Sequence, residues 1–198
     1  SGKSSLIQIE NEFKKGDVCS ILVEGSSGSA GIHLYPDKYL KNVRKLCDNY
    51  GVVLICDEVM SGFGRTGTLF AHQKKEQNIL PDIITCAKGL TSGYVPLGAV
   101  IVSNNVSNYF DENVLNQGLT YFGHTFACRV ANECIKQYKE NDMRIIKEVN
   151  EKGSIMNTIG KILCSENNLI QDYRSNGLLG GFELNLGDKK MNQVKKEL

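Results

Sequence analysis

Two charged residues, Asp57 and Lys88, each follow an apolar run closely and could do chemistry together. Asp57 comes directly after the run 52–56, and Lys88 directly after the run 83–87. Such runs are typical of buried strands in a parallel sheet, and the carboxyl ends of parallel strands meet at one edge. An amine at that edge can act as a nucleophile and as a base, and a carboxylate can stabilise a neighbouring positive charge. A structural ion pair between the two is the alternative that these positions leave open.

The segments that follow these two residues contain glycines at short intervals. Residues 58–67 read EVMSGFGRTG, and residues 89–99 read GLTSGYVPLGA. Glycine has no side chain, so it allows the backbone to pass close to a bound molecule. This composition favours a ligand site over an isolated ion pair.

Together these segments resemble the class III, or omega-type, aminotransferases, which use pyridoxal phosphate. The strongest matches have the family's order and spacing: LICDEV at 54–59, GFGRTG at 62–67, PDI at 81–83, AKGL at 87–90 and PLGA at 96–99. Weaker matches extend the resemblance over nearly the whole chain: ILVE at 21–24, TYFGH at 120–124 and GLLGGFE at 177–183.

The resemblance implies a role for four residues toward pyridoxal phosphate. Lys88 would form an imine with the cofactor aldehyde and then move a proton between the substrate carbon and the cofactor. Asp57 would keep the pyridine nitrogen protonated, which makes the ring an electron sink. Val59 would pack on one face of the ring. Thr120 would hydrogen-bond the cofactor phosphate of a neighbouring subunit, so a homodimer with shared active sites is expected.

Glu24 corresponds to a family glutamate on the substrate side of the pocket. Here Gly25 stands where the family usually has proline, a departure directly beside Glu24. No metal ligand set is expected: His33 and His72 have no carboxylate or cysteine at ligand spacing and are interpreted as surface or packing residues.

The expected activity is the transfer of an amino group from an amino acid or omega-amine to a 2-oxo acid. Residues 60–61 (MS) and 90–97 (LTSGYVPL) resemble the branch that uses pyruvate as acceptor. Two alternatives stay open. One is a non-catalytic fragment or degenerate paralogue that acts as an interaction subunit, and the other is an aminomutase on the same scaffold.

Apolar runs alternate with helical spacing along the first part of the chain. This pattern predicts an α/β domain with a mostly parallel sheet flanked by helices, and the resemblance implies the large domain of a fold type I transferase. Strands are expected at 18–24, 52–56, 83–87 and 97–102, and a helix is expected at 36–50. Two long helices at 124–140 and 142–164 and a strand at 180–186 are expected after them.

A domain boundary is expected near residue 140. Residues 1–140 would form the second half of the cofactor domain, and residues 141–198 the start of a smaller C-terminal α+β domain. The phosphate-binding loop and the substrate-binding arginine of the family cannot be located in this sequence. The chain is therefore interpreted as a fragment that lacks N-terminal and C-terminal parts.

The charge and the cysteine content narrow the classes of partner and the cellular compartment that we expect for this protein. Lys and Arg number 23 and Asp and Glu 22, so no global field would attract nucleic acid or an anionic membrane. No apolar run is long enough to span a bilayer. The seven cysteines form no CxxC pair, which favours reduced thiols and a cytoplasmic protein. A mitochondrial location stays open, because the first residue is Ser and an upstream segment could be absent.

Overall fold

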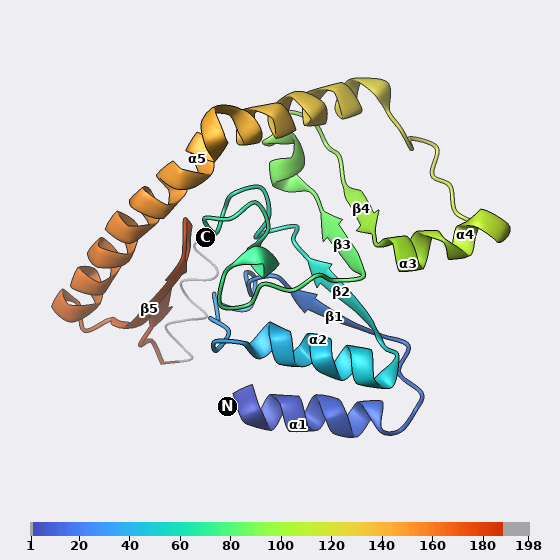
Figure 1. Cartoon of the computed structure of the whole chain (residues 1–198). Helices are drawn as coiled ribbons and strands as arrows, with labels where there is room; N and C mark the ends of the chain where they lie inside the picture. Colours follow the sequence, from blue (N-terminus) through green and yellow to red (C-terminus); the bar gives the residue numbers. More distant parts are fainter. Residues whose placement is uncertain (1, 188–198) are drawn as a thin grey trace.

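A computed structural model describes residues 2–187, and its centre is a four-stranded sheet (Figure 1). The strands, in their order across the sheet, are β1 (Ser20–Glu24), β2 (Val53–Asp57), β3 (Ile83–Cys86) and β4 (Ala99–Val102). The first three are parallel, whereas β4 is antiparallel to β3. A parallel return needs a crossover of about a dozen residues or more, usually a helix. The β3–β4 connection contains only the 3-10 helix η2 (Lys88–Thr91), which fits the antiparallel return.

Two helices cover one face of this sheet (Figure 1). Helix α2 (Tyr39–Tyr50) confirms the helix expected at 36–50 and begins three residues later, because Pro36 to Lys38 form a turn. Helix α1 (Gly2–Phe13) was not expected and lies beside α2. The shared core is apolar and includes Phe13, Val43, Cys47, Val52 and Leu54.

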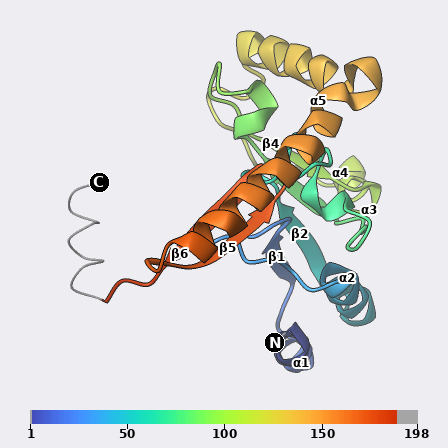
Figure 2. The same ribbon diagram turned by 90° about the vertical axis from the view of Figure 1, so that its left-hand side faces the viewer.

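The long helix α5 (Thr125–Glu166) closes the other side of the described structure (Figures 1 and 2). Its residues 140–143 leave helical geometry, so the two helices expected at 124–140 and 142–164 meet at a sharp break. His124 caps the start, where its Nδ1 accepts a hydrogen bond from the Ala127 N–H at 3.3 Å. Two short helices, α3 (Asn104–Ser107) and α4 (Tyr109–Glu112), precede it.

A hairpin of β5 (Ile170–Asn176) and β6 (Leu179–Leu184) packs against the second half of α5 (Figure 2). The strand expected at 180–186 corresponds to β6, and β5 was missed. The division into domains 1–140 and 141–198 stays a prediction, and residues 188–198 of the second one lie outside the described residues.

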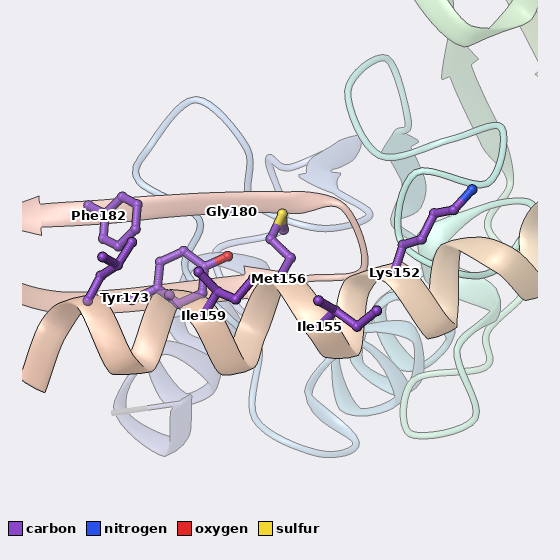
Figure 3. Close-up of a pocket in the computed structure, with 9 residues that line it drawn as sticks. Lys152, Ile155, Met156, Ile159, Tyr173, Gly180 and Phe182 are labelled. Atoms are coloured by element: carbon purple, nitrogen blue, oxygen red, sulfur yellow. The ribbon is translucent and has the colours of Figure 1, made fainter.

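An open cavity of about 430 Å³ lies between α5 and this hairpin (Figure 3). Its lining is almost entirely apolar and includes Ile155, Met156, Ile159, Tyr173 and Phe182. Figure 3 shows Met156, Ile159 and Tyr173 between the helix and the strands. The cavity contains no residue to which the sequence analysis assigned chemistry. Among residues 2–187, no helix is long and apolar enough to cross a membrane.

Candidate functional site

Asp57 and Lys88 lie at the same edge of the sheet. Asp57 is the last residue of β2 and pairs in register with Thr85 of β3, and Lys88 follows β3 by two residues. The structural ion pair left open by the sequence is not formed between them in the described part of the chain. The Lys88 side chain is exposed, so its amine is available to a ligand.

The turn that carries Lys88 is strained and tightly packed. Lys88 has a φ of 41°, a left-handed conformation that is costly for a residue with a side chain and is often found at functional sites. Gly89 lies against Phe63, and a Cβ on Gly89 would be 2.8 Å from the Phe63 Cβ. Tyr138 of α5 donates a hydrogen bond to the Gly89 carbonyl at 2.9 Å and shares one with Ser92 Oγ at 2.8 Å. Helix α5 therefore fixes the position of this turn.

Hydrogen bonds also fix the turn that carries Asp57. Its Oδ1 accepts from the Val59 N–H at 2.8 Å, and its carbonyl accepts from the Gly25 N–H at 2.9 Å. The next residue, Glu58, donates its N–H to the Thr85 carbonyl at 2.8 Å. Residues 57–59 are thus bound to the ends of both neighbouring strands, β1 and β3.

Two polar residues that hold these two turns are not predicted from the sequence. Glu58 is fully buried and binds the nearly buried His72, and Tyr138 binds the Lys88 turn. The sequence predicts only a surface or packing role for His72, but the structure shows it buried and bound to a carboxylate. The signal that could have identified Glu58 is its place directly after a buried strand, beside Asp57.

A cavity of about 580 Å³ opens beside Lys88, within the usual size range of small-molecule sites. Val59 and Lys88 both line it, together with residues of α5 and of the turn before β6. The other lining residues are Met60, Gly62, Phe63, Gly64, Arg65, Gly89, Ser92, Gly93, Tyr138, Ile145, Val149, Leu178 and Leu179.

This arrangement suits a cofactor that carries an aldehyde and a basic ring nitrogen. An exposed amine is present for covalent attachment, and a carboxylate at the adjacent strand end can stabilise a protonated ring nitrogen. Val59, two residues after Asp57, supplies an apolar surface for a ring. The residues present therefore fit such a group.

Of the five predicted residues, Val59 and Lys88 line this cavity, whereas Asp57, Glu24 and Thr120 do not. The Glu24 carboxylate accepts hydrogen bonds from the Gly28 N–H and from Ser29 Oγ, so it binds the loop that follows β1. Thr120 is exposed, in a segment between α4 and α5 that forms no helix or strand. Glu24 is nevertheless the last residue of β1 and pairs in register with Asp57, so it lies at the same edge of the sheet as Asp57. Only Thr120 lies away from this edge, on a separate exposed segment.

Comparisons with known proteins agree on one family. A family model described as Aminotransferase class-III matches residues 2–198. Gamma aminobutyrate transaminase 3, chloroplastic, of Solanum lycopersicum is 39% identical over 171 residues, which are 84% of this chain and 32% of that protein. Acetylornithine aminotransferase of Methanopyrus kandleri is 34% identical over 168 residues, which are 85% of this chain and 41% of that protein.

Among solved structures, taurine:2-oxoglutarate aminotransferase from Bifidobacterium kashiwanohense, in complex with PLP and glutamate, is similar to 98% of this chain. The TM-score is 0.88 and the sequence identity is 35%, over 46% of that protein's chain. An (S)-enantioselective omega-transaminase from Thermomicrobium roseum gives a TM-score of 0.84 at 31% identity, over 92% of this chain and 41% of its own. The chain thus spans less than half the length of these relatives.

Proposed function

Because this chain belongs to the class-III aminotransferases, we propose that the full-length protein moves an amino group from an amino acid or omega-amine to a 2-oxo acid. The observation that carries this proposal is the meeting of Lys88, Asp57 and Val59 at one edge of the sheet, beside a cavity of about 580 Å³. No observation favours the non-catalytic alternative or the aminomutase.

The family depends on pyridoxal phosphate, which two of the matched solved structures name. When bound, this cofactor supplies an electron-accepting ring that stabilises negative charge on the substrate carbon. In this chain Lys88 would hold it through a covalent bond, Asp57 would bind the ring nitrogen, and Val59 would pack on the ring face.

Lys88 is suited to hold and move a proton at its Nζ atom. An amine at the wall of a cavity can accept a proton from a bound substrate carbon and return it. The rigid turn, held by Tyr138, keeps the Lys88 backbone at the cavity wall while its side chain moves the proton.

We propose a homodimer in which Thr120 binds the cofactor phosphate of the partner subunit. This proposal is supported by the segment that carries Thr120, which does not line this chain's own Lys88 cavity. The segment also exposes large apolar side chains, with Leu119 at 68%, Tyr121 at 80% and Phe122 at 57%. Apolar exposure on this scale is typical of a surface that a second subunit covers.

The test is a visible absorbance spectrum of the full-length protein with added pyridoxal phosphate. Borohydride reduction and peptide mass mapping then locate the label. We expect a band that reports the covalent linkage and a label on Lys88. Lys88→Ala should remove both the band and the turnover of amine donors with pyruvate or 2-oxoglutarate. Lys45→Ala, at an exposed position on α2, is the matched control. A band that persists in Lys88→Ala would exclude the proposed role.

A further inference from the structure

A fully buried carboxylate, Glu58, directly follows Asp57 and accepts four hydrogen bonds. Its Oε1 accepts from the His72 N–H at 2.9 Å and from His72 Nδ1 at 2.8 Å. Its Oε2 accepts from the Ala71 N–H at 3.0 Å and from Ser61 Oγ at 2.5 Å. Two donors per oxygen fill the acceptor sites of a carboxylate, so this group is fully used inside the protein. It is not available to a substrate.

The same residue joins three parts of the chain at the edge of the sheet. The Glu58 N–H binds the Thr85 carbonyl of β3, and the Glu58 carbonyl accepts from the Gly62 N–H at 2.9 Å. Its side chain binds Ala71 and His72 of the 3-10 helix η1 (Ala71–Gln73), which lie thirteen and fourteen residues further along the chain. The backbone on either side carries Asp57 and Val59. Any movement of Glu58 is therefore passed directly to both of these residues.

His72 holds the Glu58 carboxylate in a fixed direction. The His72 ring is 2% exposed and stacks on Phe70, with ring centroids 5.7 Å apart and an angle of 12° between the planes. This stacking fixes the ring plane, and the ring in turn fixes where Nδ1 meets Oε1. A buried hydrogen bond in such a place specifies one arrangement of the backbone around it.

Gly25, at the end of β1, provides the space that Glu58 occupies. A Cβ on Gly25 would lie 2.2 Å from Glu58 Oε1 and 2.4 Å from its carboxyl carbon. The Gly25 N–H also binds the Asp57 carbonyl. The residue that departs from the proline usual in the family is thus the one that lies against this carboxylate.

From these contacts we propose that Glu58, oriented by His72, is a positioning residue that directs the Asp57 carboxylate and the Val59 side chain toward the cofactor. The inference rests on the proposed function. Without this acceptor, two buried backbone N–H groups lose their partner, and η1 must move away from residues 57–59 to reach water. The Asp57 carboxylate then loses its fixed direction, although its charge is unchanged.

The test compares cofactor affinity with stability in the full-length protein, so it needs no turnover. Pyridoxal phosphate is titrated into the apoprotein of each variant by absorbance, and urea unfolding of the apoprotein is measured beside it. Glu58→Gln replaces one acceptor oxygen with an NH2 group, which would then face hydrogen-bond donors. His72→Leu removes the Nδ1 donor, whereas His72→Asn keeps a donor near the same place and serves as the conservative rescue.

The matched control is Asp82→Asn. Asp82 is also a carboxylate in a strand connection, where it accepts from Arg44 at 2.6 Å and from the Leu54 N–H at 2.7 Å. It lies at the start of β3, the opposite end of the strand from the Asp57 edge. Asp82→Asn should lower stability, because it weakens a partly buried hydrogen-bonded ion pair, but it should leave the cofactor Kd and absorbance maximum unchanged.

We expect Glu58→Gln and His72→Leu to raise the Kd of pyridoxal phosphate by about tenfold and to shift the absorbance maximum of the Lys88-bound cofactor. His72→Asn should stay within about twofold of the wild type. If Glu58→Gln does not fold, the two His72 variants decide, because both keep the carboxylate. Equal Kd values and spectra in His72→Leu, His72→Asn and Asp82→Asn would overturn the inference. A wild type that does not bind the cofactor would overturn the proposed function itself.

Discussion

The two oxygens of Asp57 have different surroundings, and this separates its structural role from its chemical one. Oδ1 accepts from the Val59 N–H, whereas Oδ2 receives no hydrogen bond from residues 2–187. One oxygen therefore holds the turn, and the other is free for a ligand. An amide in place of the carboxylate keeps the first function, because its oxygen also accepts a hydrogen bond, but it removes the charge.

Asp57→Asn in the full-length protein should therefore lower kcat by about a hundredfold or more and change stability little. The reason is that a neutral amide cannot stabilise a positive ring nitrogen, and removal of one such electrostatic contact typically costs this much in rate. The free energy of unfolding should change by less than about 1 kcal/mol, since the Val59 contact is kept. Steady-state kinetics and urea unfolding check this. Asp37→Asn, at an exposed site, is the control, and a kcat equal to that of this control would contradict the prediction.

At the scale of the elements, the buried cysteines of β2 and α2 show how dry the sheet's helical face is. Burial raises the pKa of the Cys56 thiol to about 12 and that of the Cys47 thiol to about 11, from an ordinary value of 9.0. At pH 8 each thiol is almost entirely protonated, and the thiolate is the form that reacts.

We expect Cys47 and Cys56 to resist iodoacetamide at pH 8 until the protein unfolds, while the exposed Cys19 reacts at once. Both raised pKa values also predict a fall in stability at high pH. The unfolded chain releases these protons above pH 9.0 and the folded chain only near 11 to 12, so their contribution is complete below pH 9 and lost above it. Peptide mass mapping after labelling measures the reactivity of each cysteine. Modification of Cys56 at the rate of Cys19 would contradict it.

The packing of α5 on the β5–β6 hairpin depends on a glycine in the helix. A Cβ on Gly153 would lie 2.8 Å from the Gly177 carbonyl oxygen. The hairpin turn cannot retreat, because Gly177 itself packs against the backbone of Arg65 and Thr66, and the Leu178 N–H binds the Arg65 carbonyl at 3.0 Å. The backbone of this turn is therefore confined on both sides.

Gly153→Ala should destabilise the protein by about 1–2 kcal/mol. Alanine improves helix propensity by about 1 kcal/mol, but forcing extra atoms into a packed contact costs about 1–3 kcal/mol, and a backbone clash lies at the upper end. Urea unfolding checks the sign. The neighbouring Ser154→Ala, at an exposed position of the same helix, should instead stabilise by a few tenths of a kcal/mol. An increase in stability for both variants would show that the contact is loose.

The sequence predicted those elements whose patterns are strong and local. The three parallel strands and α2 followed from apolar runs and helical spacing, and so did the edge where Asp57 and Lys88 meet. Strand β5 was missed because its residues, IQDYRSN, form no apolar run, and its burial comes from contact with α5. The place of Glu58 after a buried strand marks it as a candidate, but its partner His72 and the partner of Tyr138, Gly89, could not be assigned because they lie 14 and 49 residues away. Such pairings depend on tertiary packing, which one-dimensional spacing does not encode.

At the scale of the whole molecule, the residues proposed for the site lie in two separate places. Lys88, Asp57 and Val59 lie at one edge of the sheet, whereas Thr120 lies on an exposed segment that does not line the same cavity. The chain spans 32% to 41% of the first three curated relatives. A shared site between two subunits would bring Thr120 of one to the Lys88 cavity of the other.

Mixed dimers test this arrangement directly. A heterodimer of one Lys88→Ala subunit and one Thr120→Ala subunit is prepared by co-expression with two affinity tags. If Thr120 acts on the partner's cofactor, one of the two sites combines both defects and the other combines the intact Lys88 with the intact Thr120. The heterodimer should then bind pyridoxal phosphate at one site with the wild-type Kd and show about half of the wild-type turnover.

The homodimers set the limits for this comparison. Lys88→Ala should be inactive, and Thr120→Ala should bind the cofactor about tenfold more weakly, because it loses a hydrogen bond to a charged phosphate. Activity is therefore measured with the cofactor concentration near the wild-type Kd, where a tenfold difference in Kd strongly changes the fraction of sites that hold the cofactor. If Thr120 acts within its own subunit, every intact Lys88 in the heterodimer is paired with a defective phosphate contact. The turnover then falls to half of that of the Thr120→Ala homodimer, and the shared site is excluded.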